Sequence, residues 1–183
     1  MPFERSRHCF QNTRTFAYGY VPNQLLFDKN MITIDFLTDH LAFIPTLTKW
    51  FRAQWPDYFA DWSQAEMERD FLEDASRDSL PIRLVAFESG ELVGTIVLRE
   101  NGSEASQEFQ PELGGLYVVE SHRGQGIGTE LVRSGMKLAL GQGYTTVYAS
   151  TVSAAGILEG LGWEYIKTVV HSDGEVALYR CKL

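Results

Sequence analysis

A glycine-rich segment carries the residue types and spacing best suited to chemistry in this chain. Residues 123–128 read Arg-Gly-Gln-Gly-Ile-Gly, with three glycines in five positions. Glycine lets the backbone turn sharply and removes Cβ atoms, so that successive N–H groups can point at one anion. A helix that begins at this turn would add its unpaired N–H groups and the positive end of its dipole. The segment therefore predicts a phosphate-binding turn.

The glycine spacing distinguishes between kinds of phosphate site. The glycines read G-x-G-x-G, whereas a dinucleotide fold needs G-x-G-x-x-G and a P-loop needs a lysine after its last glycine. No lysine follows Gly128. The segment fits the pattern R-x-x-G-x-G, and it lies directly after an apolar run at residues 116–119, which is typical of a buried strand. Directly after it, apolar or small residues recur at helical spacing, at Ile127, Leu131, Gly135 and Leu138.

In this strand-turn-helix context, the motif resembles the acetyl-CoA motif of the GCN5-related N-acetyltransferase (GNAT) family. In that family the backbone amides of the turn hold the pyrophosphate of coenzyme A. The resemblance covers residues 31–183 and implies an α/β (α+β) fold. The expected sheet is mixed but mostly antiparallel, has about six or seven strands, splays after the fourth strand and is flanked by about four helices. The alternative is a glycine-rich turn that only packs a helix tightly against a sheet.

The resemblance also implies acetyl-CoA as co-substrate, without a metal, and a set of cofactor-binding residues. These are Leu116, Tyr117, Val118, Arg123, Gly124, Gln125, Gly126, Ile127, Gly128, Thr129 and Thr151. The backbone N–H of Leu116 stands where family members stabilise the developing oxyanion. Glu112 stands where some members carry a glutamate base. A glutamate at a strand end is more often a solvated charge, so both interpretations of Glu112 stay open.

Two positions depart from the family pattern. Many members carry a tyrosine four residues before the glycine of the L-G-[FW] motif, where this chain has Leu158. That tyrosine protonates the leaving thiolate, so the role here falls to water, Ser153 or Tyr148, and a Leu158→Tyr substitution is expected to raise turnover. Thr151 stands where an asparagine often lies beside coenzyme A.

These departures leave two hypotheses about function. The first is an acetyl-CoA-dependent N-acetyltransferase, in which a small-molecule amine or a peptide N-terminus attacks the thioester directly in a ternary complex. The second is a catalytically weak acyl-CoA-binding or regulatory module. The resemblance also leaves a homodimer open.

A candidate acceptor pocket follows from two expected helices after the first strand. In the first helix, apolar residues keep helical spacing from Ile44 to Tyr58, with a bend after Pro56. The second begins at a capping box formed by Ser63 and Glu66. An aromatic cluster on these helices predicts an amine pocket around Trp55, Asp57 and Tyr58. Aromatic residues at helical spacing are more often core, and that alternative stays open.

The remaining patterns complete an alternating fold. Strands are expected at residues 32–36, 81–87, 92–98, 145–150, 164–170 and 175–181, and a short helix at residues 155–160. Ser89 and Gly90 indicate a hairpin turn, and residues 172–174 indicate another. Gly114 and Gly115 inside the strand before the motif predict a bulge or a close approach of another backbone.

Composition limits the class of protein and of partner. The chain has 183 residues, a net charge of −8 and a pI near 5.0. An acidic chain disfavours nucleic acid and anionic membrane as partners, and it is compatible with a cationic substrate. Cys9 and Cys181 lack the spacing of a metal site or a disulfide framework, so we expect neither, and we expect a cytoplasmic protein. Residues 1–30 are expected to be an extension of unknown role, outside a single domain at 31–183.

Overall fold

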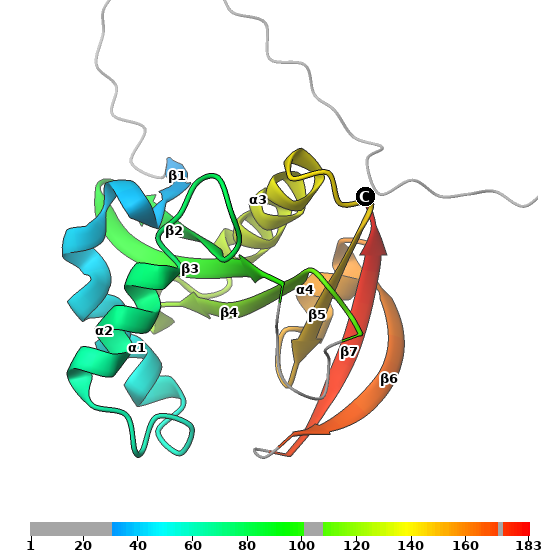
Figure 1. Cartoon of the computed structure of the whole chain (residues 1–183). Coiled ribbons are helices and arrows are strands. Elements are labelled where there is room, and N and C mark those ends of the chain that lie inside the picture. The colour runs from blue at the N-terminus through cyan, green and yellow to red at the C-terminus, as the bar shows by residue number, and fades with distance from the viewer. Residues whose placement is uncertain (1–30, 101–107, 172–173) are drawn as a thin grey trace, which may run out of the picture.

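One seven-stranded sheet organises the part of the chain that the computed structural model describes, residues 31–100, 108–171 and 174–183 (Figure 1). The strand order is β1-β2-β3-β4-β5-β7-β6. The strands are β1 (Ile32–Phe36), β2 (Ile82–Glu88), β3 (Glu91–Arg99), β4 (Glu112–Val118), β5 (Thr146–Thr151), β6 (Glu164–His171) and β7 (Gly174–Lys182). The α-helices are α1 (Ile44–Gln54), α2 (Gln64–Glu73), α3 (Ile127–Gly141) and α4 (Ala155–Gly160). The expected mixed, mostly antiparallel sheet flanked by about four helices is confirmed.

The sheet splays between its fourth and fifth strands. β4 and β5 are its parallel pair, and they are in register only where Glu112 faces Tyr148. The Tyr148 N–H donates to the Pro111 carbonyl over 2.9 Å, and beyond this point the two strands diverge (Figure 1). This confirms the predicted splay after the fourth strand. The sheet is therefore open at its centre, directly beside the end of β4 that leads to the glycine-rich turn.

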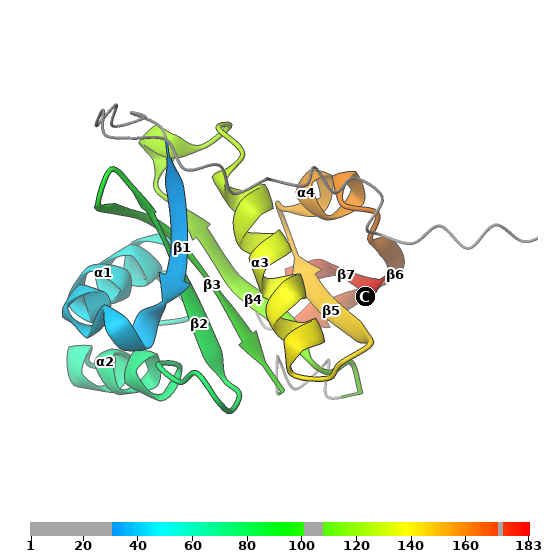
Figure 2. The ribbon, with the colours of Figure 1, turned by 90° about the horizontal axis from the view of Figure 1, so that it is seen from above.

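Helices cover both faces of the first half of the sheet. Figure 2 shows α1 and α2 on one face and α3 on the other. The apolar stripe of α3 includes Ile127, Leu131 and Met136, all buried against β2, β3 and β4. A Cβ at Gly135 would lie 2.5 Å from Cδ2 of Leu113. Glycine at this position therefore lets α3 pack closely on β4.

The pair α1 and α2 encloses a second apolar cluster. It is formed by Leu37, Ile44, Leu47, Phe51, Phe59, Met67, Phe71, Val85 and Phe87. The predicted capping box at the start of α2 is confirmed, because the Glu66 N–H donates to Ser63 Oγ (3.2 Å) and the Ser63 N–H donates to Glu66 Oε2 (2.7 Å). The cap fixes where α2 begins and so how its polar face is presented.

A hairpin turn and a bulge in the sheet match their sequence signals. Ser89 and Gly90 both have positive φ, 51° and 84°, as a tight two-residue hairpin requires. In β4, the register with β3 shifts between Thr95 and Val97, and Gly115 has φ of 55°. The predicted bulge is therefore present in β4. Residues 1–30, 101–107 and 172–173, including the expected extension and part of the last hairpin turn, lie outside the described residues.

Candidate active site

The glycine-rich turn forms the N-terminus of α3. Gly124 and Gly126 have φ of 75° and 85°, a left-handed conformation that side chains disfavour. Gly126 is the N-cap of α3, and it supplies no side chain that could bond the first N–H groups of the helix. Those groups have no carbonyl partner in a preceding turn. The geometry is that of an anion-binding helix terminus.

The glycines of the turn have different roles. A Cβ at Gly126 would meet no atom within 4 Å, so this position faces open space. A Cβ at Gly128 would lie 3.0 Å from Cδ1 of Ile157, which belongs to α4. Gly128 therefore allows α3 to pack closely against α4, which is the packing role that the alternative interpretation gave to the glycines. Gly126 leaves the helix terminus open. Ile127 is buried and contributes only its backbone to the turn.

Arg123 and Gln125 brace the turn from within. Arg123 Nε donates to the Val118 carbonyl (2.9 Å), and its Nη2 approaches Oε1 of Gln54 at 3.4 Å. The Arg123 guanidinium also lies 5.8 Å from the ring centroid of Tyr117. Gln125 Nε2 donates to the Ser121 carbonyl (3.2 Å). These side chains fix the conformation of the turn, which leaves its backbone N–H groups to meet a ligand.

His122 has partners that the sequence did not indicate. Its Nε2 lies 3.1 Å from Oε2 of Glu88 on β2, and its Nδ1 lies 2.8 Å from Oγ of Ser121. His122 belongs to the short 3₁₀ helix Glu120–His122 between β4 and the turn. The contact with Glu88 therefore ties the start of the turn to the β2–β3 hairpin.

The bulge in β4 places Leu116 at the centre of the site. Gly115 precedes it in a left-handed conformation, and Leu116, Tyr117 and Val118 are partly exposed. The Leu116 side chain lies on the α3 face, close to Gly128. The Tyr117 side chain lies on the opposite face, stacked on Trp50 at 5.1 Å. The backbone between them is thus presented at the splay.

Glu112 lies inside the protein at the point where β4 and β5 part. It is 3% exposed, so the interpretation as a solvated strand-end charge is wrong. Its Oε1 accepts hydrogen bonds from the Ser150 N–H (3.1 Å) and from the Ser150 hydroxyl. Ser150 is itself partly exposed. The carboxylate therefore bridges the two strands beyond their last ladder pair, and the Ser150 hydroxyl connects it toward the surface.

Thr151 and Leu158 both have structural contacts. Thr151 Oγ1 accepts from the Ala154 N–H (2.8 Å) and the Ser153 N–H (3.2 Å), which shapes the turn into α4. Leu158 is 3% exposed and packs in the core with Trp163. A tyrosine at position 158 would have to displace core side chains, so the expected gain in turnover from Leu158→Tyr is not supported by the packing.

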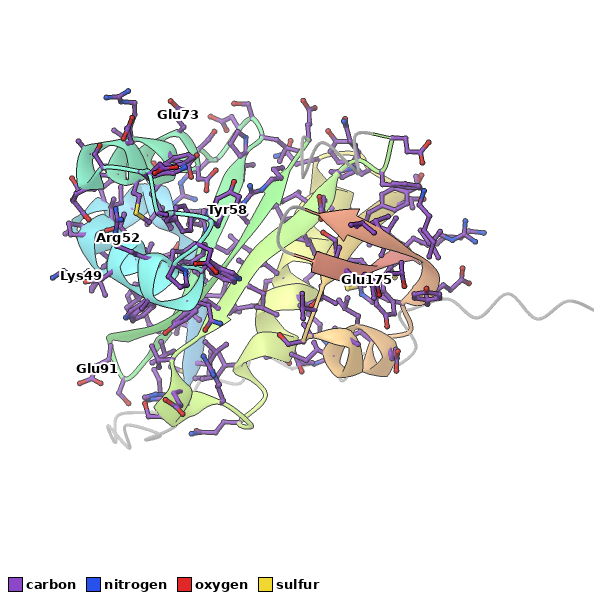
Figure 3. The ribbon with its side chains drawn as sticks, turned by 90° about the horizontal axis from the view of Figure 1, so that it is seen from below. Lys49, Arg52, Tyr58, Glu73, Glu91 and Glu175 are labelled. Carbon is purple, nitrogen blue, oxygen red and sulfur yellow. The ribbon has the colours of Figure 1, made fainter. Side chains whose placement is uncertain are left out.

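The residues of the predicted acceptor pocket follow the end of α1. α1 ends at Gln54 because Trp55 precedes a proline and leaves the helical conformation. Trp55 is half-buried against Phe51, whereas Asp57 and Tyr58 are exposed. In Figure 3, Tyr58 lies after α1 on one side of the splay between β4 and β5, and Glu175 lies on β7 on the other side.

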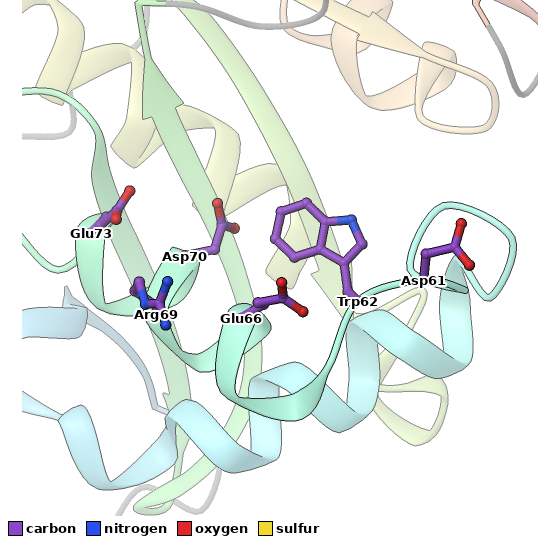
Figure 4. Close-up of a pocket in the computed structure, with 6 residues that line it drawn as sticks. All are labelled: Asp61, Trp62, Glu66, Arg69, Asp70 and Glu73. Atoms are coloured by element: carbon purple, nitrogen blue, oxygen red, sulfur yellow. The ribbon is translucent and has the colours of Figure 1, made fainter.

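An acidic hollow of about 370 Å³ lies beside this segment, on α2. Its lining is Asp61, Trp62, Glu66, Arg69, Asp70 and Glu73. Figure 4 shows the Glu66 and Asp70 carboxylates and the Trp62 indole on the same side of the helix. The pKa of the Asp70 carboxyl is raised, first because of partial desolvation and then because of the nearby Asp74 carboxylate. The sequence did not single out this hollow, although three of its carboxylates follow helical spacing.

Comparison with known proteins identifies the family. A model described as the acetyltransferase (GNAT) family matches residues 47–157, more than half of the chain. The chain belongs to the GNAT family. N-acetyltransferase family 8 member 2 from Rattus norvegicus is 36% identical to it over 84 residues, which is 44% of this chain and 37% of that protein. The chain thus aligns with little more than a third of this relative's length.

Solved structures share the GNAT fold at lower identity. A putative acetyltransferase, yncA from Salmonella typhimurium, solved with its cofactor acetyl-CoA, has a TM-score of 0.66 and 20% identity, covering 84% of this chain and 95% of its own. The aminoglycoside acetyltransferase AAC(6')-Ib, in complex with coenzyme A and kanamycin, has a TM-score of 0.64 and 20% identity, covering 83% and 95%. These likenesses support the fold.

Neither a metal-binding cluster nor a membrane-spanning helix occurs among the described residues. Within residues 31–100, 108–171 and 174–183, no group of three or more His, Cys, Asp or Glu side chains could hold a metal ion. None of the helices in the described part of the chain is long and apolar enough to cross a membrane.

Proposed function

We propose that this GNAT protein transfers the acetyl group of acetyl-CoA to a small-molecule amine, by direct attack in a ternary complex. The observation that carries the proposal is the open helix terminus at Gly126, which lies at the end of a bulged strand beside the splay of the sheet. A helix terminus suited to an anion and a partly exposed strand are thus adjacent, as a phosphorylated carrier with an extended arm requires.

The donor would bind along β4 and the turn. The backbone N–H groups from Gly124 to Thr129 would receive the pyrophosphate, with the Arg123 charge nearby. The partly exposed backbone of Leu116, Tyr117 and Val118 would pair with the amides of the pantetheine arm. This assignment is supported by the family membership of the chain and by the coenzyme A and acetyl-CoA present in structures that share its fold.

The transfer needs a hydrogen-bond donor for the oxyanion, an acceptor for the proton of the amine, and a thiol that can leave. The Leu116 N–H would stabilise the oxygen of the tetrahedral intermediate. The attacking ammonium would lose its proton to Glu112, with the Ser150 hydroxyl as the relay, since that hydroxyl already donates to the carboxylate. Coenzyme A would then leave as a thiolate, which with a thiol pKa of about 8.5 needs no strong acid.

The acceptor proposed here is a cationic small molecule. The hollow on α2 contributes four carboxylates against one arginine, and its Trp62 ring offers a face for an ammonium group. A neighbour of the same fold is an aminoglycoside acetyltransferase solved with kanamycin, which is consistent with an amine acceptor. A peptide N-terminus is the competing acceptor.

Turnover with a panel of amines tests the proposal. The full chain is incubated with acetyl-CoA and diamines, aminoglycosides, amino acids or short peptides, while free thiol release is recorded and products are identified by mass. We expect thiol release matched by an N-acetylated small amine. Acetyl-CoA binding without an acetylated product from any amine would contradict the transferase proposal and favour a binding or regulatory module.

Glu112→Gln tests the proton acceptor separately. The carboxamide keeps an oxygen for the Ser150 N–H but is no longer a base. An ammonium with a pKa near 10 is mostly protonated at neutral pH, so kcat should fall by about 10² or more, with partial recovery at higher pH. The KM for acetyl-CoA should change little. Glu120 is exposed and lies beside the turn, so Glu120→Gln is the matched control and should keep the wild-type kcat. An unchanged kcat at pH 7 in Glu112→Gln would show that Glu112 is not the base.

A further inference from the structure

Arg83 is a cation that the fold buries almost completely. It is 1% exposed, comes from β2 and packs against Phe51 of α1 and Phe71 of α2, the two helices on one face of the sheet in Figure 2. Its Nε and Nη2 both donate to Oδ2 of Asp74, over 2.8 Å for Nε, and Asp74 is itself 6% exposed. The guanidinium carbon lies 4.3 Å from the ring centroid of Phe71 and 5.2 Å from that of Phe51. These contacts hold the side chain in one position.

The remaining guanidinium nitrogen points at the bulge of β4. Nη1 is buried and has no hydrogen-bond partner among the described residues. A Cβ built at Gly115 would lie 3.5 Å from Nη1. The register explains this approach, because Arg83 pairs with Val97 and Val97 pairs with Gly114, so the three form one row across β2, β3 and β4. Because Gly115 lacks a side chain, the guanidinium can reach across β3 to the backbone of β4.

Stability alone explains this arrangement poorly. Replacing a buried ion pair by apolar residues of similar volume is often neutral or stabilising, so such a pair is weak evidence of a stabilising role. A buried N–H without a partner is unfavourable in itself. The position of Nη1 is more informative, since Gly115 immediately precedes Leu116, whose N–H is the proposed oxyanion donor.

We propose that Arg83 is a positioning residue for the acetyl thioester, which fixes the β4 bulge and places a buried positive charge behind the Leu116 N–H. Asp74 binds the Nε and Nη2 side of the guanidinium, so Nη1 presents the positive end of the ion pair to β4. A fixed charge acts more strongly in the protein interior than in water, and it favours the state in which the thioester oxygen becomes negative. This inference relies on the proposed function for the location of the thioester.

Two substitutions of Arg83 and one matched control test it. Arg83→Met removes the charge and keeps a side chain of similar length, and Arg83→Lys keeps the charge but lacks the planar guanidinium. Arg77→Met is the control, because Arg77 also pairs with a carboxylate, Asp39, and lies 4.4 Å over an aromatic ring, Phe36, but is exposed and remote from β4. The readouts are kcat, KM and the infrared band of the thioester carbonyl in bound acetyl-CoA labelled with ¹³C.

Arg83→Met should return the carbonyl band toward its frequency in free acetyl-CoA and lower kcat about tenfold, which is less than the about 10²–10³ lost with a direct oxyanion donor. The KM for acetyl-CoA should stay within about twofold of the wild type. Arg83→Lys should fall between Arg83→Met and wild type, and Arg77→Met should match wild type. A wild-type carbonyl band and kcat in folded Arg83→Met would overturn the proposal.

A second variant covers the case in which Arg83→Met does not fold. Arg83→Met combined with Asp74→Asn removes both charges of the buried pair, and it should show the same displaced carbonyl band. An unchanged band in this double variant would equally overturn the inference. The two proposals fail differently: a polarised carbonyl that depends on Arg83 but no acetylated amine would refute the transferase alone, whereas transfer unaffected by Arg83 would refute the positioning role alone.

Discussion

Two glycines at opposite ends of α3 allow the anion site to be tested with an internal control. Gly126 and Gly143 have nearly the same φ, 85° and 89°, and a Cβ at either position would meet no atom within 4 Å. Alanine at either position would therefore disturb the backbone conformation without a clash. Only Gly126, however, belongs to the proposed pyrophosphate site.

The expected effects on folding are equal and those on binding are not. An L-residue in the left-handed conformation costs roughly 1–2 kcal/mol, so both Gly126→Ala and Gly143→Ala should lower the free energy of unfolding by that amount. For a chain of this size, each kcal/mol corresponds to about 2–4 °C in Tm. A methyl group at position 126 would also obstruct the anion, and losing one hydrogen bond to a charged group costs about 1.5–3 kcal/mol. The Kd for coenzyme A should then rise about 10- to 100-fold in Gly126→Ala only.

Calorimetric titration with coenzyme A and urea unfolding of the same samples measure both effects. The predicted result is equal destabilisation of the two variants, with coenzyme A affinity retained in Gly143→Ala and weakened in Gly126→Ala. Equal affinity in both variants would refute the reasoning, because the open face of Gly126 would then lie outside the binding site.

Three further substitutions test other parts of the structure. Ser63→Ala removes the N-cap of α2 and should lower the free energy of unfolding by about 1 kcal/mol in urea denaturation; an unchanged midpoint would show that the cap is dispensable. The pKa of the Asp70 carboxyl is raised in the folded state, so the free energy of unfolding is higher at low pH and falls as the pH rises through that pKa. Asp70→Asn should therefore raise Tm at pH 7, with a gain that shrinks as the pH falls toward about 4, is nearly gone below it, and is absent in the control Glu91→Gln. Leu158→Tyr should lose about 1–3 kcal/mol of stability by overpacking, and a stable variant with faster turnover would restore the expectation drawn from the sequence.

Elements defined by residues near one another in sequence were predictable. The capping box joins Ser63 to Glu66 within one helical turn, and the hairpin turn is set by Ser89 and Gly90 themselves. The helix expected at residues 155–160 is α4, with the same bounds. The turn at residues 123–128 was predictable for the same reason, since glycine is the residue that most readily adopts its left-handed backbone.

Contacts between distant segments were not predictable from the sequence. Glu112 is buried and accepts a hydrogen bond from Ser150, which is 38 positions away in the sequence. Arg83 is paired with Asp74 only because the segment after α2 returns along β2, where the Arg83 N–H also donates to the Asp74 carbonyl (2.9 Å). In each case the pairing depends on strand register, which no local pattern specifies.

The predicted acceptor pocket shows how two local sequence signals conflicted. Aromatic spacing continued the helical period of α1 as far as Tyr58, which suggested a pocket there. The proline after Trp55 ended the helix first, and a hollow lies beside this segment on α2. The period of the apolar residues and the position of the proline had to be weighed together.

The most direct test of the proposed site is a crystal structure of the full chain with a non-hydrolysable acetyl-CoA analogue and an amine that turns over. The predicted complex has the pyrophosphate bonded to backbone N–H groups between Gly124 and Thr129, the acyl oxygen on the Leu116 N–H, and the amine within reach of Ser150. A pyrophosphate bound away from the turn, or an acyl group remote from the β4 bulge, would contradict it.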